Sequence, residues 1–470
     1  MTSDWCALLT DFVKSRIIMH IRITKGLDLK VSGDAVKTVA DMPMLRYCYV
    51  HPADFKWITP KLDVQEGGLV EIGTPLFHDK GNDQIRIASP VKGTVRQIVR
   101  GEKRVILAIV IEVDADQPLR RHVEFPDPSN AEEFTGLMCQ YGLWPMLRQR
   151  PYSSIPNPDE RPKALFVSCF DSSPLAPDYA FILQGRGEDF CSGARVLQTL
   201  AQAPVHLCLR EGADNAVFES VPDVEKHYFS GPHPAGNVGT QIHHIAPIQK
   251  GETVWYINPE DVAIIGRFFR NHELSFERTV AMTGPCVQNP RYVRIPYGAD
   301  LSILINESVE THGRASLHGN IRCISGNVLT GNTLDEWPSV RFHDRQITAI
   351  EEGGKREFIG WLLPGFKKWS LSHTFLSWLT PKRTYRFDTS LHGGRRTFMM
   401  TDVYEKVFPF ELMPLQLLKA CAIKDLEQME ALGIYEVDSE DFALCEVVCP
   451  SKTECQKIVE EAMRQMRIEN

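Results

Sequence analysis

The first quarter of the chain alternates short apolar runs with turns rich in Gly, Asp and Pro. Between residues 19 and 125 the runs are rich in β-branched residues, as in "VQEGGLVEIGTPLF" and "RVILAIVIEV". Strand-length apolar runs separated by turn residues are typical of a small barrel or sandwich. The most apolar run, Val105 to Val113, is predicted to be a buried strand.

The pattern changes near residue 126 and indicates an α/β layer. "PSNAEEFTGLMCQYG" predicts a capped helix, "ALFVSCF" a buried strand, and "DFCSGARVLQTLAQAPVHLCL" a helix followed by a strand. Alternating helices and strands of this kind form a layered α/β unit.

The remaining pattern predicts a smaller mixed unit, a second β-rich stretch and a helical end. Residues 259–312 show one helix, two strands around the Gly284-Pro285 turn, and a helix that opens at Asp300. Residues 402–470 carry apolar side chains at three- and four-residue spacing, which predicts helices.

Composition excludes several classes of protein. The chain has 470 residues, 43% of them hydrophobic, and a net charge of −8, so it carries no field that would attract nucleic acid. No apolar run reaches the roughly 18 residues that a membrane-spanning helix needs. Asp4 and Asp11 interrupt the start where a signal peptide would be basic and apolar. The 12 scattered cysteines favour reduced thiols without disulfides.

The segment "PLFHDKGNDQIRIASPVKGTV" resembles the hairpin of lipoyl and biotinyl domains, in which a lysine at a tight turn carries the cofactor. Lys80 lies near that position, but "GND" follows it directly, so the hairpin is expected to be longer than the one that modifying enzymes recognise. A barrel-sandwich scaffold without a carrier role is the alternative, and it needs glycine turns such as Gly73 in either case.

The C-terminal region carries part of an iron–sulfur motif. Cys445 and Cys449 are the last two positions of a C-x2-C-x2-C-x3-C-P run, the thiolate spacing of [4Fe–4S] clusters. The first two positions are Ser439 and Phe442. An earlier copy of the frame ends at Phe408-Pro409 and has lost every ligand; its other positions are Phe398, Thr401 and Tyr404. Cys421 and Cys455 lack ligand spacing, so we predict a helical domain that has lost its clusters.

Several blocks together resemble one protein family. They are "KGLDL", "PVKGTVRQIVRGEKR", "FSGPHPAGNVGTQIH", "ERTVAMTGP" and "EFIGWLLPG". The chain is similar to the A subunits of the bacterial sodium-translocating NADH:quinone reductases. That family is in turn similar to the C subunits of the Rnf electron-transport complexes and to the flavin-bearing, NADH-oxidising subunit of complex I. The resemblance starts near Met19, so we interpret residues 1–18 as a lineage-specific extension or a misassigned start.

The resemblance implies a function for the whole assembly. The chain would be a peripheral subunit, on the cytoplasmic face of the bacterial inner membrane, of an oxidoreductase and translocase that couples electron transfer from NADH to ubiquinone with sodium export. NAD, flavin and iron–sulfur centres are expected on other subunits, and this chain is expected to hold no tightly bound cofactor and to be non-catalytic alone. A role in quinone access or assembly is one hypothesis, and a purely structural scaffold is the other.

The combined pattern and resemblance predict an α+β multidomain fold. The expected units are an N-terminal extension (1–18), a lipoyl-like barrel-sandwich domain (19–125), a Rossmann-like α/β domain (126–258), a β-grasp module of the SLBB type (259–312), a second β-rich region (313–401) and a helical domain resembling a degenerate double-cluster ferredoxin (402–470).

One loop is the candidate site. Relatives carry a glycine-rich loop for flavin or dinucleotide here, whereas this chain reads Gly231, Pro232, His233, Pro234, Ala235, Gly236. The prolines lack the N–H donors that a phosphate cradle uses. We expect a stiff, exposed loop in which His233, with Gly231, Pro232, Pro234 and Gly236, contacts a quinone; a structural turn or a contact between subunits is the alternative. A strand would point His243 and His244 to opposite faces, so we expect no metal ligands.

A basic and aromatic segment near residue 370 is the last feature. Leu371, Phe375, Trp378 and Leu379 would share one face of a helix over residues 365–387. The flanking basic residues are Lys367, Lys368, Lys382, Arg383 and Arg386. The stripe either packs on the protein's own core or docks on membrane subunits.

Overall fold

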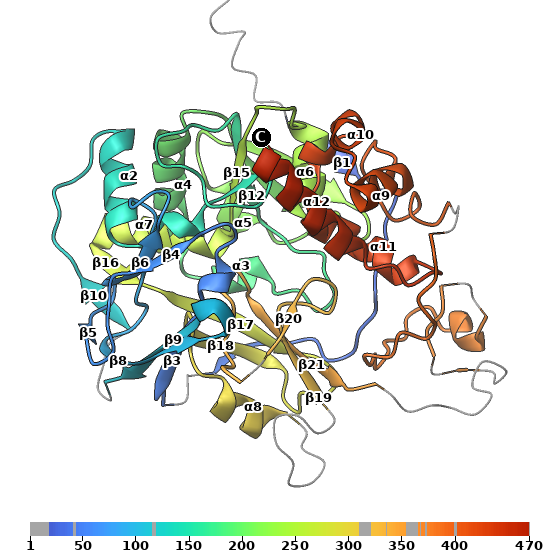
Figure 1. Ribbon diagram of the computed structural model, residues 1–470, viewed down its shortest axis with the longest axis horizontal. Helices are drawn as coiled ribbons and strands as arrows, with labels where there is room; N and C mark the ends of the chain where they lie inside the picture. Colours follow the sequence, from blue (N-terminus) through green and yellow to red (C-terminus); the bar gives the residue numbers. More distant parts are fainter. Residues whose placement is uncertain are drawn as a thin grey trace, which may run out of the picture.

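The fold was analysed in a computed structural model that describes residues 18–40, 44–114, 119–309, 321–334, 336–353, 365–366, 368–371, 374–398 and 402–469. It is a mixed α/β multidomain chain (Figure 1). The proposed extension at residues 1–18 lies outside the described residues except for Ile18.

A six-stranded sheet, here called the central sheet, organises the α/β layer. Its order is β1 (His20–Arg22), β14 (Glu225–Ser230), β13 (Val205–Arg210), β12 (Ala164–Ser168), β15 (Val254–Ile257) and β11 (Arg148–Arg150). Neighbouring strands are parallel from β1 to β15, and β11 is antiparallel to β15. Parallel strands buried on both faces read as continuous apolar runs, which is why "ALFVS" and "VWYI" form the middle of the sheet.

Helices cover both faces of the central sheet. On one face, α4 (Gly187–Ala201) and α7 (Pro259–Asn271) pack against side chains such as Leu165 and Trp255. On the other, α6 (Val238–Ile245) packs against Phe166 and Tyr256. The division follows the alternation of side chains along each strand. Further helices are α2 (Ala131–Gln140), α3 (Tyr179–Ile182) and α5 (Ala216–Glu219).

Local sequence signals account for several of these elements. The predicted capped helix is α2, and the side chain of Asn130 accepts a hydrogen bond from the N–H of Glu133 (3.0 Å). Helices α4 and α7 approach closely because each has a glycine at the crossing. A Cβ at Gly266 would lie 1.7 Å from the Asp189 carbonyl oxygen, and one at Gly193 would lie 1.9 Å from that of Val262.

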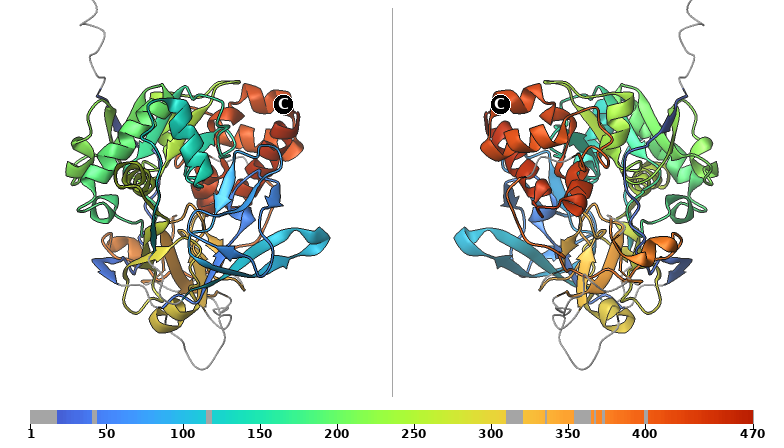
Figure 2. Two further views of the ribbon diagram at one scale, coloured as in Figure 1. Left: turned by 90° about the vertical axis from the view of Figure 1, so that its left-hand side faces the viewer. Right: turned by 90° about the vertical axis from the view of Figure 1, so that its right-hand side faces the viewer.

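Residues 44–114 of the predicted β-rich region 19–125 form two antiparallel sheets, whereas its first strands, His20–Arg22 and Val36–Ala40, pair in other sheets. One has the order β3 (Tyr47–Val50), β9 (Ile106–Val113), β8 (Gly93–Arg100), β5 (Leu69–Val70), and the other β4 (Pro60–Leu62), β6 (Pro75–Asp79), β7 (Arg86–Ala88). Figure 2 shows the long hairpin of β8 and β9, in light blue, reaching away from the rest of the molecule. The apolar run that ends at Val113 is β9, and most of its residues are buried, as predicted.

A third large sheet joins segments that are distant in sequence. Its order is β2 (Val36–Ala40), β18 (Arg291–Pro296), β17 (Glu277–Thr283), β21 (Gln346–Glu351), β19 (Ile321–Ser325) and β20 (Asn332–Thr333). The short strands β10 (Arg120–His122) and β16 (Glu273–Ser275) pair separately. Helix α8 (Ser302–Ser308) begins beside Asp300, whose carboxylate accepts a hydrogen bond from the N–H of Ser302 (2.9 Å). The predicted strand, turn, strand and helix are therefore confirmed.

Buried charges connect α7 to this third sheet. Arg345, which directly precedes β21, donates from Nε to Glu260 (3.0 Å) and from Nη2 to Asp261 (2.6 Å). Arg186 donates to the other oxygen of Glu260 (3.1 Å). Both carboxylates are completely buried. Such charges are tolerated because each is paired and hydrogen-bonded, so the network fixes the position of α7 on the sheet.

The C-terminal region is helical, as predicted. It contains α9 (Pro414–Ile423), α10 (Leu426–Ala431), α11 (Ala443–Val448) and α12 (Cys455–Glu469), with 3-10 helices η6 (Ile434–Glu436) and η7 (Ser439–Phe442). Figure 1 shows these helices in red against the central sheet. A buried ion pair between Arg150 Nη1 and Asp441 Oδ2 (2.9 Å) and an exposed one between Lys250 and Glu430 (2.7 Å) join the two parts.

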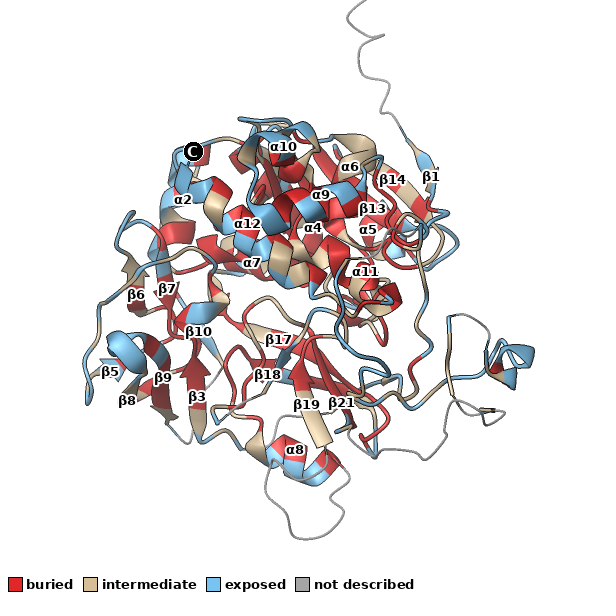
Figure 3. Ribbon diagram, turned by 45° about the vertical axis from the view of Figure 1, so that its right-hand side comes forward, coloured by how far each residue is buried: buried red, intermediate tan, exposed pale blue. Residues whose placement is uncertain are grey.

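The helix predicted over residues 365–387 is wrong for the part that the structure describes. Only Leu376–Leu379 are helical there, as the 3-10 turn η5. Trp378 and Leu379 are more than half exposed, and the turn lies at the edge of the molecule in Figure 3. Lys367 falls outside the described residues. A helical spacing of apolar residues forms a stable helix only when its apolar face is covered, and here little covers it.

No helix within the described ranges is long and apolar enough to cross a membrane. The cysteines in those ranges are free thiols.

Candidate functional site

The loop of residues 231–236, here called the proline loop, connects β14 to α6. It therefore lies at the edge of the central sheet where the parallel strands end. Ligands of open α/β sheets bind outside this edge, so the location is that of a binding loop.

The chain's own N-terminal segment lies directly on the proline loop. The N–H of His233 donates to Asp28 Oδ1 (2.8 Å). A Cβ at Gly231 would lie 2.0 Å from the carbonyl oxygen of Ile23, and one at Gly26 would lie 2.1 Å from that of His233. The "KGLDL" block and the proline loop are therefore in backbone contact, and only glycine fits at these two positions.

The segment after β12 holds the loop from the other side. Ser172 Oγ accepts a hydrogen bond from the N–H of Gly236 (2.8 Å) and lies 3.0 Å from His233 Nδ1. That hydroxyl can donate its proton to Nδ1 or accept a second hydrogen bond from it, depending on the tautomer of His233. Ser168 Oγ donates to the carbonyl oxygen of Gly236 (3.0 Å). The loop is closed by protein groups on both sides.

The expectation that His233 is exposed is wrong. Its exposed fraction is 4%, and burial lowers its pKa to about 4. The ring is therefore neutral near pH 7. The sequence signal failed because proline favours surface turns, whereas this turn is covered by the residue 23–28 segment, which is distant in sequence.

The proline loop does not fit the phosphate of a flavin or dinucleotide. A phosphate cradle needs free backbone N–H groups, but those of His233 and Gly236 are bonded to Asp28 and Ser172. Pro232 and Pro234 have none. A quinone headgroup at His233 would require the covering segments to move.

His243 and His244 lie on helix α6, so the predicted strand is wrong. His243 Nδ1 lies 2.6 Å from Glu436 Oε2, and its Nε2 accepts a hydrogen bond from the N–H of Glu411 (2.9 Å). His244 Nδ1 donates to the Thr240 carbonyl (2.8 Å). These contacts attach α6 to the C-terminal helices, and His243 is a structural contact between the two regions.

The iron–sulfur frame is filled by aromatic rings. Tyr404 Oη lies 2.9 Å from Cys449 Sγ, and the rings of Phe408 and Phe442 are 4.9 Å apart. Cys445 is completely buried, and burial raises its pKa well above the usual range. Clusters need several thiolates converging on one space, so these residues do not fit an iron–sulfur cluster.

Lys80 is exposed directly after β6, in the turn that leads to β7. The turn is tied back to the body of the protein, because Asn82 Nδ2 donates to Asn157 Oδ1 (3.2 Å). Both hypotheses for this hairpin, carrier and scaffold, stay predictions.

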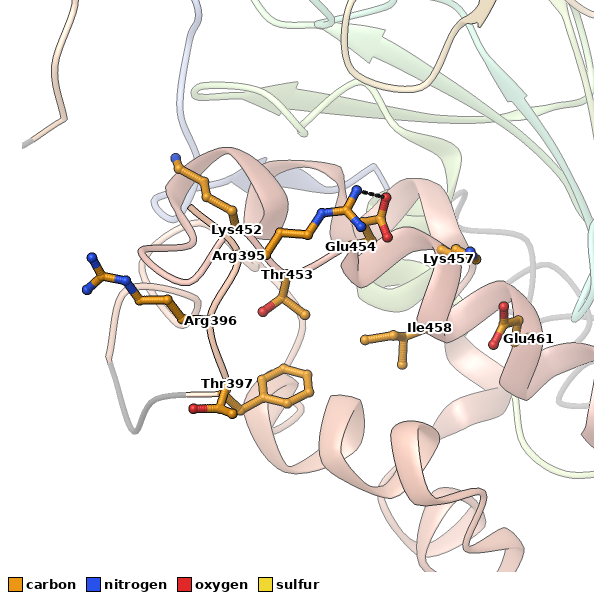
Figure 4. Close-up of a pocket in the computed structure, with 10 residues that line it drawn as sticks. Arg395, Arg396, Thr397, Lys452, Thr453, Glu454, Lys457, Ile458 and Glu461 are labelled. Carbon is orange, nitrogen blue, oxygen red and sulfur yellow. Dashed lines mark hydrogen bonds and ion pairs between the residues drawn. The ribbon is translucent and has the colours of Figure 1, made fainter. Parts of the chain in front are cut away.

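Two surface clefts lie on the C-terminal region, and neither is lined by the proline loop. Figure 4 shows the first, which Arg395, Arg396, Lys452 and Lys457 surround, with Arg395 paired to Glu454 (2.7 Å). The second runs between the loop after α6 and helix α10. Glu454 and Glu461 also line the first cleft, so its charged lining is mixed, with basic side chains in excess.

The sequence analysis missed one group of convergent side chains: His206, Glu225 and His227. Glu225 and His227 are two residues apart on β14, a spacing that places both on one face of a strand. That spacing was the available signal, but His206 comes from β13 and only the register of the sheet adds it.

Comparison with known proteins identifies the same family over most of the chain. Three family models match: "NqrA N-terminal barrel-sandwich hybrid domain" at residues 21–114, "NqrA second alpha/beta domain" at 129–274, and "NQRA C-terminal domain" at 279–336.

Individual relatives are named as the A subunits of Na(+)-translocating NADH-quinone reductases. The protein of Rhodopirellula baltica is 36% identical over 94% of this chain and 96% of its own length. The Yersinia pestis protein is 36% identical over 96% of this chain and 100% of its own length. The Neisseria meningitidis protein is 37% identical over 92% of this chain and 96% of its own length. Among solved structures, an NAD+-reducing [NiFe]-hydrogenase aligns with a TM-score of 0.34 at 11% identity over 66% of this chain and 55% of that chain, which is too weak to support an argument.

Proposed function

The chain belongs to the NqrA family, the A subunits of the Na(+)-translocating NADH-quinone reductases, and we propose that it is a peripheral docking subunit of such a reductase. We place it on the cytoplasmic face of the bacterial inner membrane. In this role it holds no redox cofactor itself. It contributes to assembly of the complex that transfers electrons from NADH to quinone and exports sodium.

The observation that carries the proposal is an exposed segment formed by the described residues between 366 and 391, here called the docking segment. Six of its large apolar side chains are between 41% and 60% exposed: Phe366, Leu371, Leu376, Trp378, Leu379 and Leu391. Exposed large apolar side chains that gather in one segment are typical of an interaction surface. Lys382, Arg383 and Arg386 are also exposed in it, which suits an acidic protein surface or lipid headgroups.

The C-terminal region supports descent from an electron-transfer domain. In two-cluster ferredoxins the fourth cysteine of each run binds the other run's cluster. Two contacts support the same exchange: Tyr404 of the first frame contacts Cys449, the fourth position of the second, and Phe408, the fourth position of the first, packs on Phe442 of the second. We infer a degenerate double-cluster ferredoxin whose space is now apolar core.

The closed proline loop supports a scaffold over a direct quinone contact. His233 is buried and bonded through its backbone to Asp28 and through its ring to Ser172. A loop held on both sides is a rigid support for neighbouring subunits. Quinone binding at this loop is the competing hypothesis.

Charge reversal in the docking segment tests the proposal. The triple variant Lys382→Glu, Arg383→Glu, Arg386→Glu is expected to fold, with an unchanged circular dichroism spectrum, but not to co-purify with the other subunits at moderate salt. The matched control reverses Arg96, Lys103 and Arg104, three exposed basic residues on the β8–β9 hairpin, and should co-purify normally. If both variants co-purify like the wild type, the docking segment is not the interface. A saturable tryptophan response to a short-chain ubiquinone that Asp28→Ala alters would favour the quinone hypothesis instead.

A further inference from the structure

Strands β13 and β14 bring two histidines and a glutamate together on the face of the central sheet that α6 covers. The strands are parallel, with His206 opposite Glu225 and Cys208 opposite His227. Side chains two residues apart lie on the same face. The three polar groups therefore come together at the start of both strands, at the edge opposite the proline loop.

The ligand atoms form a small triangle. His206 Nδ1 lies 3.0 Å from His227 Nε2 and 3.2 Å from Glu225 Oε2, and the third side, from His227 Nε2 to Glu225 Oε2, is 3.8 Å. A tetrahedral ion with bonds of about 2.0 to 2.1 Å separates its ligands by roughly 3.3 Å. One ion can therefore reach all three atoms without a change of backbone.

The three ligand atoms offer more hydrogen-bond acceptors than there are protons to satisfy them. Two ring nitrogens 3.0 Å apart have room for one N–H between them. At least two of the three atoms then present lone pairs to the same point. The other nitrogen of His227, Nδ1, is buried without a hydrogen-bond partner among the described residues, so the polar contacts of this ring all lie in the cluster.

The chemistry of the donors suits a transition metal. Both imidazoles are buried, and imidazole binds metals as the neutral base. Phe166 packs on the His206 ring, with centroids 4.7 Å apart, and limits its movement. Glu225 is 35% exposed, while the two histidines are 7% and 1% exposed, so an ion can enter from the Glu225 side.

We propose that His206, Glu225 and His227 form a binding site for one divalent transition-metal ion of the zinc class. Two imidazoles and a carboxylate are a known ligand set for zinc, and three protein ligands leave a fourth position for water. Copper, nickel and cobalt would compete for the same donors in the usual order of affinity. The ion would link β13 to β14 on the sheet face that α6 covers, and α6 is the helix that contacts the C-terminal region.

Metal titration of the full chain tests the site. The protein, purified through a tag without histidines and treated with a chelator, is titrated with Co2+, whose visible absorption reports tetrahedral coordination, and then with Zn2+. We expect about one ion per chain and displacement of cobalt by zinc. Glu225→Gln should weaken binding by more than about tenfold, because even indirect partners of a metal site contribute about 10- to 100-fold. His227→Gln should abolish the cobalt spectrum.

The control removes a different pair of histidines. The ring centroids of His122 and His272 lie 6.2 Å apart, and Asp127 lies near His272. The variant His122→Gln, His272→Gln should bind cobalt normally. Circular dichroism identifies a variant that fails to fold. If His227→Gln fails to fold, the cobalt binding of Glu225→Gln decides, because the Glu225 side chain is partly exposed. Either of two results would overturn the proposal: no cobalt bound by the wild type at neutral pH, or cobalt binding that Glu225→Gln leaves unchanged.

Discussion

The closed state of the proline loop predicts how the stability of the protein depends on pH. His233 has a pKa of about 4 in the folded chain because it is buried, compared with about 6.5 in an unfolded chain. As pH falls, the unfolded chain takes up this proton first. The neutral ring therefore stabilises the fold fully above about pH 6.5, and this stability is lost as pH falls towards 4.

The size of the effect follows from the two pKa values. One pKa unit corresponds to about 1.36 kcal/mol. At pH 5 the unfolded imidazole is almost fully protonated and the buried one is mostly neutral, so linkage predicts a loss of about 2 kcal/mol relative to pH 7.5 from this residue alone. Other buried histidines add to the total, so a variant is needed to isolate it.

The variant is His233→Asn. The asparagine amide offers both a donor and an acceptor, so it can keep a hydrogen bond with the Ser172 hydroxyl, which lies 3.0 Å from Nδ1, and the new side chain does not titrate. Urea unfolding followed by tryptophan fluorescence at pH 7.5 and pH 5.0 measures the free energy of unfolding of both proteins. The wild type should lose about 2 kcal/mol more than the variant between the two pH values.

His392 provides the control, because its side chain is 79% exposed. His392→Asn should leave the pH dependence as in the wild type. If wild type and His233→Asn instead lose the same free energy of unfolding between the two pH values, that result contradicts the prediction, because it means that His233 titrates like an exposed histidine. The loop would then be open in solution, and a direct quinone contact would become the better hypothesis.

Three further predictions test packing and pairing. Cys449→Ser should cost about 1 kcal/mol and leave the complex assembled and active, since the thiol is core and not a ligand; an iron signal in the wild type that the variant loses would contradict this. Arg150→Met should lower the free energy of unfolding in urea by about 3–5 kcal/mol, because it leaves buried carboxylates without their partner. Lys250→Ala, in the exposed pair between the same two regions, should lower it by less than about 1 kcal/mol. Gly266→Ala should lower the melting temperature, because a Cβ would clash at the α4–α7 crossing, while Gly136→Ala, with open space around it in α2, should raise it; a raised melting temperature for both would show that the crossing is not tight.

The elements that the sequence predicted correctly depend on local signals. Asn130 caps α2 through its own side chain, and the buried runs of β9 and β12 are apolar over a strand's length. Short-range hydrogen bonds and continuous hydrophobicity are properties of a few consecutive residues, so the chain alone determines them. The family resemblance in separate blocks was equally readable from the sequence, and the comparisons confirm it.

The features that only the tertiary structure decided depend on distant segments. His233 is buried because residues 23–28 cover its loop. Of the described residues between 365 and 387, only Leu376–Leu379 are helical, because little covers the predicted apolar face. The cluster of His206, Glu225 and His227 exists only through the register of β13 against β14. Burial and convergence are set by which surfaces meet in three dimensions, and no spacing along a single segment specifies that meeting.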